Sequence, residues 1–95
     1  MRTMLRWTVP ADQGNKAVND GSMGSVIEAV MAKASPEAAC FLAEGRDRSG
    51  IVVCDLREPA DIPPIAEIPF NGLHARVESV PVMNGDDLEK TLASL

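Results

Sequence analysis

Apolar and polar residues alternate in two parts of the chain, at the spacing of β-strands that bury one face. The first part spans residues 4–10 and the second spans residues 73–82. Pro10 closes the first part, because proline has no amide hydrogen to donate to a neighbouring strand. One face of each strand is therefore predicted to be apolar: Leu5, Trp7 and Val9 in the first, Ala75 and Val77 in the second.

Between about residues 15 and 33 the apolar residues recur at spacings of three to five, which predicts an amphipathic helix after a loop at residues 11–15. Gly21 and Gly24 each weaken that helix by roughly 1 kcal/mol relative to alanine, so we expect a kink or a break near them. The helix is predicted to end before Pro36, because the residue that precedes a proline avoids the α conformation.

Two apolar runs, residues 37–43 and 50–56, flank a charged segment and predict a pair of strands joined by a hairpin. If the turn is centred on Asp47 and contains no bulge, Cys40 and Cys54 face each other across the hairpin. We interpret both cysteines as small residues that pack in the interior, rather than as a disulfide, a metal site or a reactive thiol. The sequence has one histidine and no C-x-x-C spacing, whereas zinc needs four donors.

Two further helices are predicted in the second half of the chain. Asp61 is expected to cap a helix of about two turns, which Pro69 limits. Asp86 or Asp87 is expected to cap a last helix. The leucines of this last helix lie on one side of it: Leu88, Leu92 and Leu95.

The predicted order is β-α-β-β-α-β followed by a terminal helix, which is the ferredoxin-like arrangement of the α+β class. Right-handed crossovers place the two main helices on one face of a four-stranded antiparallel sheet with strand order 4-1-3-2. The 95 residues are expected to form a single domain, residues 1–95.

Composition and charge exclude several classes of function. The net charge is −5 and no basic stripe is present, which argues against nucleic-acid binding and against docking to an anionic membrane. No apolar run approaches the roughly 20 residues that span a bilayer, and the N-terminus lacks the pattern of a signal peptide. A cytoplasmic location is therefore expected, where a structural disulfide is unusual.

Polar residues of the first and last strands suggest a candidate site on the sheet face away from the helices. Arg6 and Thr8 of the first strand are expected to lie beside His74, Arg76 and Glu78 of the last. A histidine near a carboxylate can act as a general base and an arginine can hold an anionic substrate, so His74, Arg76 and Arg6 are the candidate catalytic residues. The alternative is a solvated or dimer-facing surface with cross-strand charge pairs.

The candidate ligand-binding residues are Trp7, Thr8, Glu78 and Glu67. For Trp7 the sequence favours a core anchor over a platform for a stacked ligand, and for Glu67 it favours a surface residue over a buried carboxylate with a raised pKa. The two arginines of the hairpin tip, GRDRSG, can bind an anion or can simply be solvated. No metal site and no cofactor are expected.

Three segments together resemble a group of small bacterial proteins of unknown function: SPEAACFLAEGRDRSGIVVCDL, DIPPIAEIPF and ARVESVPVMNGDDLEK. The resemblance covers most of the chain from Ser35 onward. That group has a ferredoxin-like, dimeric α/β-barrel fold that is similar in shape to muconolactone isomerase. The resemblance implies a homodimer in which the uncovered sheet faces of two subunits meet, and it brings no catalytic residues with it.

The central hairpin gives an independent reason to expect a homodimer. Both alternating sets of side chains in its strands are apolar, so helices on one face leave an apolar surface on the other. A large exposed apolar patch is unusual in a monomer, and a second copy of the chain would cover it. The two predicted sets for the uncovered face are Cys40, Leu42, Val52 and Cys54, or Ala39, Phe41, Ile51 and Val53.

Three hypotheses for function are consistent with the sequence. The first is a homodimeric small-molecule binding or accessory module with a cleft between sheet and helices. The second is a small isomerase or cofactor-free monooxygenase-like enzyme that acts on a small organic acid; a cavity lined by His74 and an arginine would favour it, whereas a filled sheet interface would favour the module. The third is a structural subunit of a larger assembly, since an acidic surface can meet a basic partner.

Overall fold

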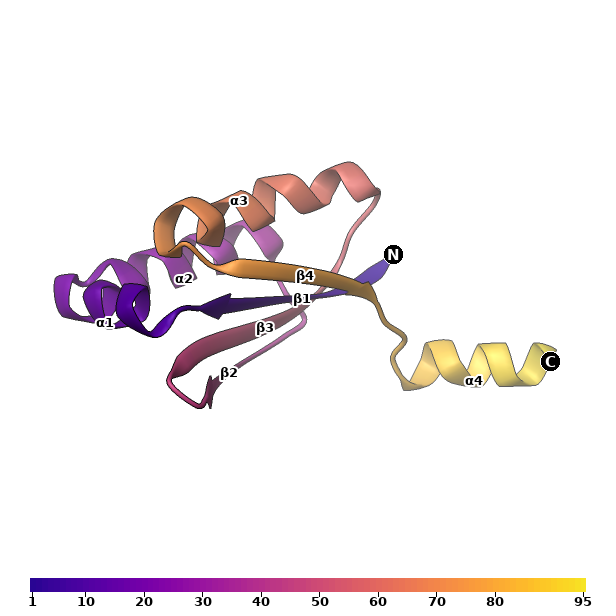
Figure 1. The fold of residues 1–95 in the computed structure, drawn as a ribbon. Helices are drawn as coiled ribbons and strands as arrows, with labels where there is room; N and C mark the ends of the chain where they lie inside the picture. Colours follow the sequence, from indigo (N-terminus) through magenta and orange to yellow (C-terminus); the bar gives the residue numbers. More distant parts are fainter.

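The computed structural model describes all 95 residues as one sheet with helices on one face and a last helix that stands apart (Figure 1). The elements follow the order β1 (Arg2–Val9), α1 (Ala11–Asp20), α2 (Ser22–Ala34), β2 (Ala38–Glu44), β3 (Asp47–Asp55), a 3-10 turn (Pro59–Asp61), α3 (Ile62–Leu73), β4 (Arg76–Pro81) and α4 (Gly85–Ser94). None of the helices has the length and the apolar character that crossing a bilayer requires.

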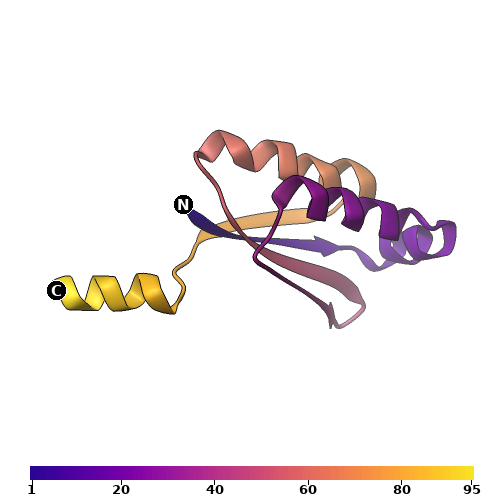
Figure 2. The same cartoon turned by 180° about the vertical axis from the view of Figure 1, so that it is seen from behind.

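The four strands form one antiparallel sheet in the order β2-β3-β1-β4. Read from the β4 edge, the neighbours are those of the predicted order 4-1-3-2. The helices α2 and α3 lie side by side on one face of the sheet, while the opposite face has no helix over it, as Figure 2 shows from behind. This uncovered side is called the open sheet face below.

The core lies between the sheet and the helices, as the alternation in β1 predicts. Leu5 is 2% exposed and Trp7 is 3% exposed, and both point toward the helix side. Val30 of α2, Val52 of β3 and Leu73 of α3 complete the centre of the same cluster. Because each side chain is almost fully removed from water, the hydrophobic effect on this one layer holds sheet and helices together.

The predicted break in the first helical region is confirmed, but the start of that region was placed too late. Gly21 has a φ of 82° and separates α1 from α2. A residue in this left-handed conformation ends a helix, and glycine adopts it without a steric penalty. The predicted loop at residues 11–15 is instead the first part of α1, which begins directly after Pro10 with Asp12 in its first turn. A carboxylate there complements the helix dipole.

The register of the β2–β3 hairpin differs from the prediction. Its turn consists of Gly45 and Arg46, with Glu44 opposite Asp47. Gly45 has a φ of 60°, which suits the first central residue of a two-residue turn. Cys40 therefore lies opposite Ile51, and the expectation that it faces Cys54 is wrong. The shift also places Cys40 on the face opposite to Cys54.

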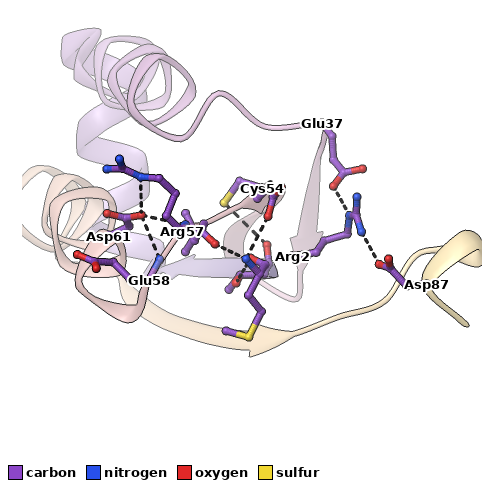
Figure 3. Close-up of polar contacts among 11 residues, drawn as sticks. Arg2, Glu37, Cys54, Arg57, Glu58, Asp61 and Asp87 are labelled. Atoms are coloured by element: carbon purple, nitrogen blue, oxygen red, sulfur yellow. Dashed lines mark hydrogen bonds and ion pairs between the residues drawn. The ribbon is translucent and has the colours of Figure 1, made fainter. Parts of the chain in front are cut away.

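The helix α3 runs through Pro69 to Leu73 and is longer than the predicted two turns. Pro69 removes one backbone hydrogen bond, but its ring is almost fully buried, and that burial offsets part of the loss. Asp61 precedes α3, yet its side chain accepts bonds from the backbone amides of Arg57 and Glu58 instead of capping α3 (Figure 3). His74 then caps the end of α3, and β4 begins only at Arg76, two residues past it.

The last helix, α4, stands clear of the rest of the domain (Figures 1 and 2). Its cap is Asn84 and not Asp86 or Asp87; Asn84 and Asp87 bond reciprocally in a capping box. Arg2 of β1 lies between Glu37 and Asp87 and forms an ion pair with each, as Figure 3 shows. The start of α4 is thus fixed to the sheet, whereas its leucines face solvent: Leu88, Leu92 and Leu95 are 44%, 59% and 92% exposed.

Candidate functional site

An open apolar groove lies between the β2–β3 hairpin and α2. It has a volume of about 320 Å³ and is called the Trp7 groove. This volume is at the lower end of the range, about 300–1,000 Å³, that small-molecule sites occupy. The lining residues come from β1, α2, β2 and β3: Trp7, Val9, Met23, Ile27, Phe41, Leu42, Ala43, Arg48 and Ser49.

Two aromatic rings form one wall of the Trp7 groove. The ring centroids of Trp7 and Phe41 are 6.2 Å apart with an interplanar angle of 63°, an edge-to-face arrangement. Phe41 is 54% exposed, because no helix covers the edge strand β2. Met23 and Ile27 form the α2 wall; they are four residues apart and therefore share one side of the helix.

Gly50 allows the Trp7 ring of this wall to lie close to the backbone of β3. Its Cα lies beneath Trp7, and a Cβ added there would be 2.1 Å from Cζ2 of the indole. Only a glycine leaves room for a large ring to lie against the backbone of the neighbouring strand at this distance. Trp7 belongs to the core and also lines the groove. Its interpretation as a core anchor is therefore compatible with its place among the candidate ligand-binding residues.

Arg48 is the charged residue of the groove, and α1 holds it in place. Its Nη1 atom donates to Oδ1 of Asn15 at 3.1 Å. The guanidinium lies against Gly14, where a Cβ would be 2.7 Å from Nη1. None of the ion pairs in the protein involves Arg48. An arginine with no carboxylate partner, at the rim of an apolar groove, retains donors for an anion.

The candidate polar residues on the open sheet face are brought together, with one exception. Arg6 lies opposite Glu78 and Thr8 lies opposite Arg76, so these four form one cluster. Glu44 joins the cluster through an ion pair with Arg6 and accepts a hydrogen bond from Ser49 Oγ at 2.7 Å.

The bond from Ser49, and next the bond from Arg6, lower the pKa of Glu44. A lowered pKa makes the Glu44 carboxylate a weaker base and therefore a poor proton acceptor for general-base catalysis.

His74 is the exception, and its expected place beside Arg76 and Glu78 is wrong. It has a φ of 52° at the end of α3 and is exposed. It borders a shallow polar hollow whose lining includes Lys16 and Asp20 of α1 but no arginine. The reason is the length of α3: the helix includes Leu73, which the alternation had assigned to the last strand, and His74 adopts the left-handed conformation that ends it. Glu67, the remaining candidate, is exposed on α3 and accepts a hydrogen bond from Asn71 at 2.9 Å.

The two cysteines have different surroundings. Cys54 is fully buried in the core cluster, and burial, followed by the charge of Asp55, raises the pKa of its thiol. This is the packing role that was predicted for it. Cys40 is exposed on the open sheet face, so the packing interpretation does not hold for it within one subunit. No cluster of three or more histidine, cysteine or acidic side chains is arranged to hold a metal ion.

The open sheet face carries an apolar patch beside the polar cluster. Met4 lies opposite Val53 on one side and Val80 on the other, and Ile51 lies opposite Cys40. Val53 and Ile51 are half-buried and Val80 is 43% exposed. This patch mixes the two sets predicted for the uncovered face, because the hairpin register differs by three residues from the predicted one, and an odd shift moves side chains to the other face.

The sequence interpretation missed the partnership of Arg48 with α1 and the role of α2 in the groove. The arginines of the hairpin tip were considered as anion binders, but Gly14 and Asn15 were assigned to a loop. The bond between Arg48 and Asn15 joins residues 33 positions apart, so no local pattern reports it. The spacing of Met23 and Ile27 did place both on the buried side of a helix.

Comparisons with protein-family models, with curated proteins and with solved structures find no match to the chain. The family resemblance seen in the sequence therefore stays a prediction.

Proposed function

We propose that this protein is a homodimeric binding module that holds a small organic molecule in the Trp7 groove. The observation that carries the proposal is the groove itself: aromatic and aliphatic side chains surround an open space, with a positioned arginine at its rim. Sites for small molecules have this composition, mostly apolar walls with a small number of fixed polar groups. The small isomerase or monooxygenase-like alternative gains no support from His74, because no arginine shares its hollow.

The homodimer is supported by two apolar surfaces that one subunit leaves uncovered. The first is the patch around Met4, Ile51 and Val53 on the open sheet face. The second is the leucine side of α4, a helix of ten residues with no buried side chain. Isolated helices of this length are marginal in water, so α4 needs a surface to pack on. A second copy supplies cover for both, which also agrees with the resemblance.

We also propose that each subunit is ferredoxin-like and that the pair forms a dimeric α/β barrel. The strand order β4-β1-β3-β2, the antiparallel pairing and the helices on one face support the first part. The open sheet face supports the dimeric barrel, since two subunits whose sheets pack face to face each bury the apolar patch of that face. The polar cluster around Arg6 and Glu44 would then lie at the edge of the interface.

A neutral fluorescent probe tests the groove without reference to charge. N-phenyl-1-naphthylamine should bind the wild-type chain at one site per subunit and brighten as it leaves water. Ala43→Trp fills the groove and should abolish the signal, whereas Ala29→Trp, on the exposed side of α2, should leave it unchanged. An absent signal, or one that survives Ala43→Trp, would refute the proposed binding site.

Sedimentation tests the dimer. At low micromolar concentration the chain should sediment at twice its subunit mass of 10.1 kDa. Val53→Lys places a charge in the proposed interface and should give a folded monomer, while Val18→Lys changes an exposed valine of α1 and should stay dimeric. Cys40 should react slowly with a thiol reagent in the dimer and quickly in the monomer. A folded wild-type particle of 10.1 kDa would overturn the homodimer.

A further inference from the structure

We infer that the ligand of the Trp7 groove is a small hydrophobic carboxylate whose anionic head binds Arg48. The inference rests on the proposed function, because it names the class of molecule that the same groove would hold. The apolar walls would take an aromatic or branched body, and the guanidinium would take the acid.

Arg48 is the one residue of the groove that can choose between ligands by charge. Of the residues that line the groove, seven are hydrophobic, and Ser49 already donates its hydroxyl to Glu44 at 2.7 Å and lies 3.3 Å from the hydroxyl of Thr8. Arg48 has a single side-chain bond, from Nη1 to Asn15. Its other nitrogens carry donors in the planar fork that matches a carboxylate.

The position of Arg48 is set before any ligand arrives. Asn15 accepts from one nitrogen, and Gly14 leaves a space that the guanidinium occupies. A side chain that is already held loses less conformational freedom on binding than a free one, so its contacts contribute more to affinity. Arg46, two residues away at the hairpin tip, is exposed and has none of these supports. Arg46 is therefore a matched control: it carries the same charge as Arg48 but is not held in position at the groove.

The other charged hollows do not suit an anion. The polar cluster on the open sheet face has two arginines but three carboxylates around it, from Glu44, Asp47 and Glu78. The hollow beside α3 combines Lys33 and Arg57 with Asp55 and Asp61. In both places acidic side chains share the hollow with the cations, whereas the Trp7 groove has a cation and no acid.

The test compares 4-phenylbutyrate with 4-phenylbutanamide, which have the same body and differ in charge. Titrations of the full chain would be followed by 1H–15N NMR, with the indole N–H of Trp7 and the amides of Met23 and Ile27 as reporters. The acid should bind about tenfold more tightly than the amide, as expected for one partly solvated charge-assisted contact. Arg48→Gln should remove this preference, and Arg46→Gln should keep it.

The outcomes separate this inference from the proposed function. Equal binding of acid and amide at the groove reporters would overturn the carboxylate and leave the groove proposal intact. A preference for the acid that persists in Arg48→Gln would also overturn the inference, because another group would be responsible. If the neutral naphthylamine probe fails as well, the groove proposal falls with it. The NMR spectrum of each variant shows directly whether it is folded.

Discussion

Replacement of Gly50 by alanine should destabilise the protein strongly, because Trp7 occupies the space that the new methyl group needs. The added Cβ would be 2.1, 2.4 and 2.6 Å from three atoms of the indole ring, all closer than a carbon contact allows. Trp7 is 3% exposed and belongs to the core cluster, so a shift of the ring disturbs the core.

The size of the effect follows from the two ways in which the structure can respond. If the core absorbs the clash, overpacking typically costs about 1–3 kcal/mol. If the ring leaves the core, the loss approaches that of removing a buried tryptophan side chain, about 3–5 kcal/mol. We therefore expect a loss near 3 kcal/mol, a large part of the total stability of a small domain.

Urea unfolding followed by circular dichroism measures this loss, with Gly24→Ala as the matched control. A Cβ at Gly24 would meet no atom within 4 Å, and the residue lies in α2. Gly24→Ala should therefore stabilise the protein by about 0.5–1 kcal/mol. In a Trp7→Leu background, Gly50→Ala should cost much less than it does in the wild type. A Gly50→Ala variant within about 0.5 kcal/mol of the wild type would refute the assigned contact, since even the milder of the two responses costs more than this.

Three further predictions concern α4, the core and the buried thiol. The hydrogen bond from the backbone amide of Asn84, and next the contact with Arg2, lower the pKa of Asp87. The ion pair that attaches α4 to the sheet is therefore fully formed above the ordinary carboxyl pKa of about 3.9, and it is lost as the pH falls through the lowered pKa of Asp87. The amide chemical shifts of α4 should change only in that acidic window. Leu5→Ala should cost about 2–5 kcal/mol in urea unfolding, because Leu5 is 2% exposed at the centre of the core. Cys54 should resist a thiol reagent in the native wild type and in the monomeric variant, and should react only after denaturation.

The sequence predicts the sheet well where one face of a strand is buried. In β1 the alternation around Trp7 identifies the core side, and the pairing of β1 with β3 and β4 follows from the order of elements. The prediction fails in the hairpin, where both faces are apolar and alternation gives no information on register. Gly45 was the informative residue for the register, because a two-residue turn favours glycine at its first central position.

The boundaries of the helices show a second limit of local patterns. Pro69 was expected to end α3, since proline breaks helices in isolation. In the folded chain its ring is buried, and Gly72 fits closely against Val26 of α2, so packing between helices carries α3 to Leu73. The same extension moved His74 off the sheet and separated it from Arg76. An error of about one helical turn was therefore enough to change the composition of the predicted site.

The edge strand β2 connects the two surfaces that the proposed function needs. Its residues from Ala38 to Ala43 are all apolar, and only Leu42 among them is even partly buried. Edge strands are usually protected by charged side chains, proline or a covering segment, because exposed edges invite pairing with other chains. In β2 the side chain of Phe41 lies in the Trp7 groove, whereas Cys40 faces the open sheet face. One strand that is apolar on both sides is thus explained if a ligand covers one side and a second subunit covers the other.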